Sequence, residues 1–135
     1  MKALRLTLML AAAALLSGCH ESIEKRAQRE AREYTERYCP TPVQNYTRTD
    51  SVAFDTGTKT YHYYCSVVNE LDNKATFDLN EAKITTALLQ NIRENPSFRT
   101  YKKAGFAFAW TIRSDKDKRT VYYNKVFAPK DYAAK

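Results

Sequence analysis

The side chains that most often carry enzyme chemistry are scarce in this sequence. Its 135 residues include only two histidines, and no Ser or Cys nucleophile with an acidic partner can be assembled around His62. Asp115 and Asp117 have the spacing that opens a calcium-binding loop, but lysines interleave them and the required Gly and closing Glu are absent. The sequence therefore indicates no catalytic residue, no metal ligands and no cofactor, and it favours a protein that is not an enzyme.

The other candidates for chemistry are three cysteines, and the first of them follows an export signal. Two basic residues lie within the first five, and an apolar run covers residues 6–16. A spanning helix needs ~20 apolar residues, so this run is too short to cross a membrane. The segment is typical of a cleaved secretory signal.

The residues at the end of this run are Leu16, Ser17, Gly18 and Cys19, and they resemble the lipobox of bacterial lipoproteins. The resemblance implies a diacylglyceryl group on the Cys19 thiol, cleavage before Cys19 and acylation of the freed amine. The alternative is an ordinary signal followed by a chance cysteine. In the family's enteric pattern an Asp after the cysteine retains the protein in the inner membrane. His20 stands there instead, which implies the outer membrane, either its periplasmic leaflet or the cell surface.

If Cys19 carries lipid, Cys39 and Cys65 remain as a pair in an oxidising compartment. We therefore expect a structural disulfide between them. The two positions are 26 apart, and a closed loop of that size contributes roughly 3 to 4 kcal/mol of stability. A metal pair or a redox couple is the alternative, but the sequence shows neither Cys-x-x-Cys spacing nor a neighbouring His.

A helix is expected at the start of the mature chain, over residues 21–38, which contain no Gly or Pro. Its apolar residues recur at helical spacing on one face, namely Ile23, Ala27, Ala31, Tyr34 and Tyr38. Oppositely charged side chains four residues apart occupy the other positions, which is typical of a solvated face. We expect the aromatic second half to pack on the domain and the first half to act as a spacer from the membrane.

Two hairpins and a second helix are expected after it. Alternating β-formers predict one hairpin from residues 46–54 and 59–68, and another from residues 106–112 and 119–127. Asp78 and Glu81 form a capping box ahead of the second helix. The core-facing residues of that helix would be Ile84, Leu88, Leu89 and Ile92.

A short helix is expected over residues 97–103, and the tail from residue 128 is expected to fray. The order helix, hairpin, helix, hairpin predicts an α+β domain with a four-stranded antiparallel sheet and helices packed on one face. The chain would thus comprise a signal peptide over 1–18, the lipidated cysteine and first helix over 19–38, and a small α+β domain over 39–135 that continues from that helix.

The formal charge of +7 does not predict a nucleic-acid partner. Lys2 and Arg5 belong to the cleaved segment, so the mature chain carries +5, and many of its cations pair with acids along the first helix. The exported location also argues against nucleic acid. The oligomeric state is not indicated.

The ten tyrosines are the most unusual feature of the composition. If register allows, His62, Tyr64 and one of Tyr122 or Tyr123 would form an aromatic row on a sheet face that no helix covers. Exposed aromatic patches on small domains often mark binding surfaces. The first hypothesis is a lipid-anchored, non-enzymatic protein that binds an envelope protein or a glycan through this face. The alternatives are an accessory subunit of an envelope assembly that docks through its first helix and, least favoured, a hydrolytic enzyme.

Overall fold

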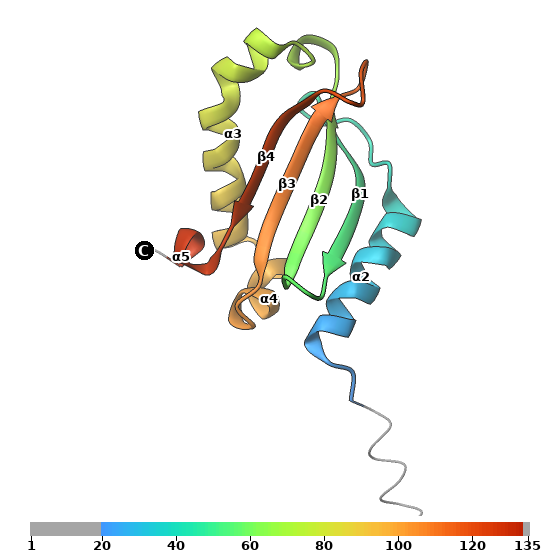
Figure 1. Cartoon of the computed structure of the whole chain (residues 1–135), viewed down its shortest axis with the longest axis vertical. Helices are drawn as coiled ribbons and strands as arrows, with labels where there is room; N and C mark the ends of the chain where they lie inside the picture. The colour runs from blue at the N-terminus through green and yellow to red at the C-terminus, as the bar shows by residue number, and fades with distance from the viewer. Residues whose placement is uncertain (1–19, 134–135) are drawn as a thin grey trace, which may run out of the picture.

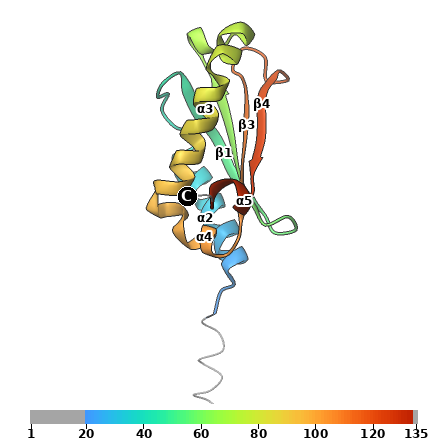
Figure 2. The same ribbon diagram turned by 90° about the vertical axis from the view of Figure 1, so that its left-hand side faces the viewer.

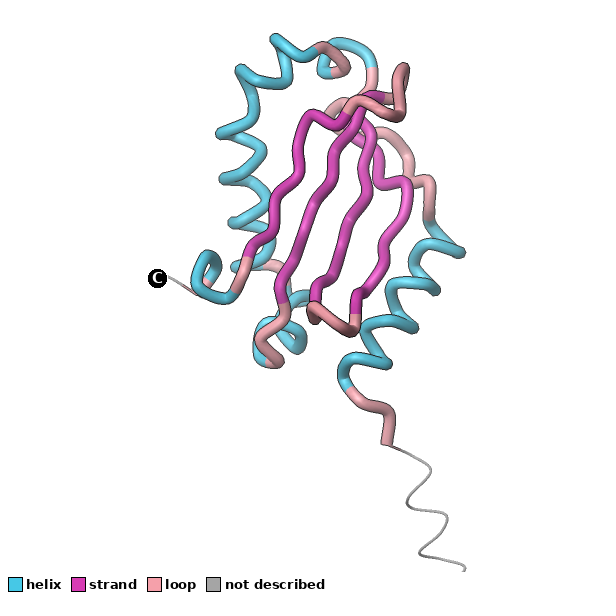
Figure 3. Tube along the Cα trace, viewed as in Figure 1, coloured by secondary structure: helices cyan, strands magenta, loops and turns pink. Residues whose placement is uncertain are grey.

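The computed structural model describes residues 20–133 as an α+β domain with four helices and a four-stranded sheet (Figure 1 and Figure 3). The predicted signal peptide and Cys19 lie outside the described residues. In chain order the elements are α2 (Ile23–Tyr38), β1 (Thr47–Asp55), β2 (Thr60–Val67), the 3-10 turn η1 (Asn69–Leu71), α3 (Lys74–Glu94), the 3-10 turn η2 (Pro96–Phe98), α4 (Arg99–Lys103), β3 (Ala107–Ser114), β4 (Val121–Phe127) and α5 (Pro129–Tyr132).

The sheet is mixed, and the prediction of a purely antiparallel sheet was wrong. Its strand order is β1-β2-β3-β4. The two predicted hairpins are both present, as antiparallel pairs of β1 with β2 and of β3 with β4. The central pair is parallel, with Thr60 opposite Ala107 at one end and Val67 opposite Ser114 at the other.

The parallel pair follows from the length of α3. Its 21 residues extend about 31 Å at 1.5 Å per residue, which exceeds the length of an eight-residue strand, about 26 Å. The helix therefore carries the chain from the end of β2 back to the level at which β2 began, and β3 starts there. The helix is longer than expected because Asn73, rather than Asp78, caps it: the Asn73 side chain accepts a hydrogen bond from the amide of Thr76.

Helix α2 begins after Ser22, whose side chain accepts the amide hydrogen of Lys25. Its buried residues are Ala27 and Ala31, in the middle of the helix. The small alanine side chains let the helix lie against β1. The second half contacts the sheet as expected, through Ala31 and through Thr35, which bonds to Val52, although Tyr34 and Tyr38 are exposed. The expectation that the first half is only a spacer was wrong, because Ala27 is fully buried.

The core lies between one face of the sheet and the helices. Phe77 and Ile92 of α3 and Phe108 of β3 are fully buried in it, together with Phe106. The short helix α4 adds Tyr101, as expected. The tail is ordered through residue 133, contrary to expectation, because α5 inserts Tyr132 and its hydroxyl donates to the Phe106 carbonyl at 2.6 Å.

Helices α2 and α3 lie on the same side of the sheet, one along each edge, and the opposite face is uncovered (Figure 1 and Figure 2). The prediction of helices on one face is confirmed in this respect. Within residues 20–133, no helix combines the length and the apolar character that crossing a bilayer requires.

Candidate functional site

A groove runs between α2 and α3 on the helical side of the sheet. Side chains of β1 and β2 form its floor, and the two helices form its walls. One section, of about 370 Å³, is lined by Val52, Tyr61 and Tyr63 from the strands together with residues of both helices. The adjoining section shares Tyr34 of α2 and Asn91 of α3 with the first, so the hollow is continuous along the helices.

One face of α3 lines the groove and a neighbouring hollow. The lining residues recur at intervals of three or four: Leu88, Asn91 and Asn95 line the groove, and Thr76, Asn80 and Ile84 line the neighbouring hollow, to which α2 contributes no residue. The span from Thr76 to Asn95 corresponds to about 28 Å of helix. Ile84 and Leu88 were expected in the core, but the structure leaves both half-buried, because Leu88 faces the groove and Ile84 faces the neighbouring hollow.

The opposite wall carries two tyrosines of α2. Tyr34 and Tyr38 are 41% and 58% exposed, and their ring centroids lie 5.2 Å apart. Both rings line the groove. An exposed pair of tyrosines beside half-buried aliphatic residues offers apolar area with polar tips, which suits a protein interface.

The floor is rigid and aromatic. The ring of Tyr63 stacks on Trp110 with centroids 4.7 Å apart. Tyr61 packs against Tyr63 and Tyr101. Burial raises the pKa of Tyr61 to about 12, so its hydroxyl stays protonated and neutral at physiological pH. A floor whose rings pack against one another can present a fixed shape to a ligand.

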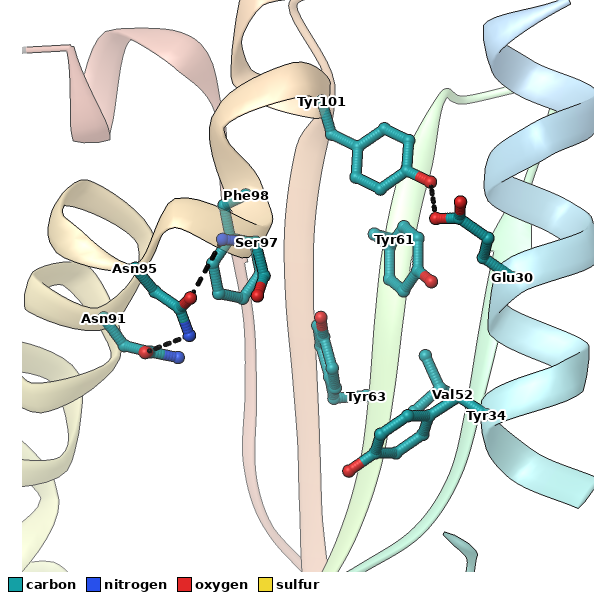
Figure 4. Close-up of a pocket in the computed structure, with 10 residues that line it drawn as sticks. All are labelled: Glu30, Tyr34, Val52, Tyr61, Tyr63, Asn91, Asn95, Ser97, Phe98 and Tyr101. Carbon is teal, nitrogen blue, oxygen red and sulfur yellow. Dashed lines mark hydrogen bonds between the residues drawn. The ribbon is translucent and has the colours of Figure 1, made fainter. Parts of the chain in front are cut away.

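The end of the groove near the start of α2 is closed by a bridge between helices (Figure 4). The Tyr101 hydroxyl of α4 donates to the Glu30 carboxylate of α2. Glu30 also accepts from Arg26 at 2.8 Å. Burial pushes the pKa of Glu30 upward, but the hydrogen bonds from Tyr101 and Arg26 outweigh it and the pKa lies below its ordinary value. The Glu30 carboxylate is therefore already hydrogen-bonded to two side chains of the protein.

Amide groups occupy the α3 side of this end. The Asn95 side chain accepts from the amide of Ser97 at 3.0 Å and donates to the Asn91 side chain at 3.1 Å (Figure 4). Asn91 keeps further donor and acceptor capacity directed toward the groove, because an amide side chain can make four hydrogen bonds. The groove thus offers tyrosine hydroxyls and amides around an apolar centre. No nucleophile paired with a base lies among its lining residues.

No group of three or more His, Cys, Asp or Glu side chains gathers as a metal site would require within the part of the chain that the structure describes. Asp115 and Asp117 hold local structure instead. Asp115 pairs with Arg48 at 2.7 Å, and Asp117 accepts from Thr120 at the tip of the β3–β4 hairpin.

The aromatic row predicted on the uncovered sheet face is reduced to His62 and Tyr64. Their rings stack with centroids 4.3 Å apart, and His62 Nε2 shares a hydrogen bond of 2.9 Å with Thr111 Oγ1. Tyr123 is on the other face, 3% exposed and bonded to Thr85 at 2.8 Å. An irregularity in the β3–β4 pairing turns Tyr122 the same way, where it stacks on Phe77 and donates to Asp72. Binding by His62 and Tyr64 stays a prediction.

Cys39 and Cys65 lie in the same part of the fold, each as a free thiol in the structure. Cys65 is opposite Thr49 in the sheet. The carbonyl of Thr49 accepts from the amide of Thr41, two residues after Cys39, at 3.0 Å. The disulfide stays a prediction, as does lipidation of Cys19.

The groove residues follow a helical periodicity that is equally typical of residues buried in a core. Tyr34 and Tyr38 share a helical face with Ala27 and Ala31, and Leu88 shares one with Ile92. Along this face of α2, the small Ala residues contact the sheet and the larger Tyr residues project into the groove. The change from Ala to Tyr is the only sequence signal that separates the two groups. The groove appears only when both helices are placed on the sheet.

Comparison with known proteins adds a family and a set of structures. A family model described as a domain of unknown function, DUF8479, matches residues 22–123. No curated protein sequence matches the chain. A crystal structure of a protein described as secreted, from Pseudomonas aeruginosa, matches with a TM-score of 0.68 at 12% identity, over 84% of this chain and 99% of that one.

Two further structures are pilotins of type II secretion systems. EpsS from Vibrio vulnificus matches with a TM-score of 0.65 at 11% identity, over 83% of this chain and 93% of its own. AspS from Vibrio cholerae matches with a TM-score of 0.60 at 9% identity, over 80% and 90%. At these identities the likeness is one of fold.

Proposed function

The chain belongs to the DUF8479 family, and we propose that it is a lipid-anchored accessory protein of an envelope assembly that binds a helical segment of a partner protein in the groove between α2 and α3. The observation that carries this proposal is the continuous groove, with tyrosines on one wall, the half-buried Leu88 on the other and no catalytic constellation among its lining residues. The shared fold with two type II secretion pilotins supports it.

The geometry favours a helix as the occupant. The floor consists of side chains on the face of the sheet, so no free strand edge is available in the groove to pair with an extended peptide. A helix satisfies its own backbone hydrogen bonds and can bury one apolar face between two other helices. Such a helix would meet Leu88 and Asn91 on one side and Tyr34 on the other.

This proposal replaces the sheet face with the groove as the main binding surface, and it retains the role of the first helix. In the alternative drawn from the sequence, an accessory subunit docks through that helix. The structure supports that idea with Tyr34 and Tyr38, which project from α2 into the groove.

Attachment through Cys19 completes the proposal and places the protein at the outer membrane, in the periplasmic leaflet or on the cell surface. Cys19→Ser removes the thiol that would carry the diacylglyceryl group, so the protein should lack radiolabelled fatty acid and keep its signal peptide. Incorporation of the radiolabel measures acylation, and mass spectrometry of the N-terminal peptide shows whether the signal peptide has been removed. An unmodified Cys19 in the native protein would contradict the anchor.

Binding in the groove is tested by a photoreactive residue at position 88, with one at position 126 as the control. Leu88 lines the groove, whereas Val126 lies opposite Ala109 on the uncovered face and is 55% exposed. In intact cells, position 88 should crosslink to a component of an envelope assembly and position 126 should not. Leu88→Asp should abolish partner binding by the purified chain, while Val126→Asp should not. Crosslinks from position 126 alone would favour the sheet face instead.

A further inference from the structure

One end of the domain carries a cluster of basic side chains, formed by Lys59, Arg99, Lys102 and Lys103, which we term the basic end. Lys59 is the last residue of the turn between β1 and β2, and the other three residues belong to α4. The turn and α4 are adjacent, because the Lys59 carbonyl accepts from the Ala107 amide just after α4, at 3.0 Å. Figure 1 and Figure 2 both place α4 at the end of the molecule where α2 begins.

The basic end has a surplus of uncompensated positive charge. Arg99 and Lys103 are exposed and form no ion pair with any residue between 20 and 133. Lys102 donates to the Arg93 carbonyl at the end of α3, which neutralises no charge. Lys59 forms an ion pair with Glu24 at 3.8 Å and remains 58% exposed.

The acidic side chains near this end are already committed to other groups. Glu21 binds Arg29 through two hydrogen bonds, and Glu30 binds Arg26 and Tyr101. Asp55 accepts the amides of Gly57 and Thr58 within the β1–β2 turn. Asp55 keeps its negative charge, and Glu24 offsets part of the charge of Lys59. Arg99, Lys102 and Lys103 are therefore the cations of this end that form no ion pair with residues 20–133.

The tether between the proposed lipid anchor and this end is short. Only His20, Glu21 and Ser22 separate Cys19 from the first residue of α2. Four extended residue steps reach about 14 Å at most. Glu24, in the first turn of α2, lies 3.8 Å from Lys59, so the start of the helix lies beside the basic end. An anchor at Cys19 would keep these cations near the lipid headgroups.

We propose that the basic end rests on an anionic phospholipid surface and thereby sets the orientation of the domain on its membrane. This inference depends on the lipid anchor of the proposed function. Anionic headgroups attract Lys and Arg within about one Debye length, ~8 Å at physiological salt. With the basic end against the bilayer, the long axis of α2 points away from it, and the groove opens sideways above the headgroups, accessible to a partner that shares the membrane.

The experiment uses the mature lipidated protein in vesicles of phosphatidylcholine alone or with phosphatidylglycerol. A membrane-impermeant amine reagent followed by peptide mass spectrometry measures exposure of each lysine. Lys59 and Lys103 should be protected in the anionic vesicles and regain reactivity at high salt. Lys116 and Lys118, on the β3–β4 hairpin at the far end, should react equally in both. Equal labelling of Lys103 in the two vesicle types overturns the proposal.

Two variants that each lose three positive charges distinguish an effect of the basic end from an effect of the net charge of the protein. Lys59→Gln/Arg99→Gln/Lys103→Gln should remove the protection of Lys102, since each lost cation weakens the bound orientation about fivefold. Lys116→Gln/Lys118→Gln/Arg119→Gln, which removes the same charge from the far end, should leave it unchanged. Loss of protection in both variants would contradict a localised surface.

Flotation with the vesicles distinguishes the anchor from the orientation. A chain that floats but shows no composition-dependent protection overturns the orientation and leaves the lipid anchor intact. A chain that floats with neither vesicle type overturns the anchor and the orientation that depends on it.

Discussion

Thr35 of α2 forms the hydrogen bonds that a neighbouring strand would form with Val52 of β1. Its Oγ1 accepts the Val52 amide at 2.8 Å and donates to the Val52 carbonyl at 2.9 Å. β1 is an edge strand, and such strands expose unpaired backbone groups that invite aggregation. One threonine therefore fastens the first helix to the sheet and covers part of its edge.

Replacing Thr35 with Val should destabilise the domain by about 1 to 3 kcal/mol, because both bonds to Val52 are lost while the side-chain shape is kept. Urea unfolding of the mature chain measures the change. Thr86→Val is the control: Thr86 also bonds to the carbonyl four residues earlier, as Thr35 does, but reaches no strand. An equal effect of the two substitutions would contradict a special role for Thr35.

Tyr101→Phe should open the bridge that closes the groove. Losing a hydrogen bond to a carboxylate costs about 1.5 to 3 kcal/mol. The pKa of Glu30 should rise, because the bond from Tyr101 helps to hold it below its ordinary value. Carboxyl NMR titration of Glu30 measures this shift. Tyr38→Phe, on an exposed ring of the same groove, should leave that titration unchanged.

The thermodynamic sign of this change is defined. A carboxyl whose pKa is lowered in the folded state contributes stability above its unfolded pKa and loses it as pH falls through the folded pKa. The difference in stability between the native chain and Tyr101→Phe should therefore shrink as pH falls below about 4.5. A difference that stays constant down to pH 3 would exclude ionised Glu30 as the acceptor.

The thiols of Cys39 and Cys65 should resist alkylation in denaturant until a reductant is added. Denaturant is required because burial raises the pKa of the Cys65 thiol to about 11 and also raises that of Cys39. A buried reduced thiol would then react slowly even without a disulfide. Mass spectrometry counts the labels, and two labels without reductant would show that the predicted disulfide is absent.

Stability should fall as the pH is lowered from 7.5 toward 5.5, in part through His62. Burial lowers the pKa of His62, so the unfolded chain binds a proton more readily than the folded chain below about pH 6.5. The contribution of His62 to the free energy of unfolding is complete above that pH. It declines as the pH falls from the pKa of His62 in the unfolded chain to its lower pKa in the folded chain. Thermal unfolding of His62→Gln, which can still bond Thr111, should show a smaller decline. An identical decline would assign the effect to other groups.

The hairpins and the first helix could be predicted from the sequence because their signals are local. Alternation along residues 106–112 and the charge pairs of residues 21–38 do not depend on distant contacts. The start of α3 depended on a choice between two caps, Asn73 and Asp78. The earlier cap lengthened the helix by more than a turn. The antiparallel prediction failed for another reason: a helix between two strands returns the chain to the level at which the first strand began, which favours parallel pairing.

The groove could not be predicted for a different reason. Hydrophobic periodicity finds the face of a helix that avoids water, but it does not show how far that face stands from the sheet. Ala31 and Tyr34 satisfy the same periodicity, yet one is buried and the other lines a hollow. Likewise, the irregular pairing of β4 turned Tyr122 to the same face as Tyr123, and strict alternation does not anticipate such a shift.

The parallel pairing of β2 with β3 also sets the order in which the chain can assemble. Thr60 and Ala107 meet across 46 intervening residues, whereas each hairpin closes over only a few. The longer closure costs roughly 2 kcal/mol more in chain entropy, so the hairpins can form before they meet. A defect confined to α3 should therefore leave two competent hairpins without the connection that aligns them, and the kinetic signature of such a defect would be slower folding rather than faster unfolding.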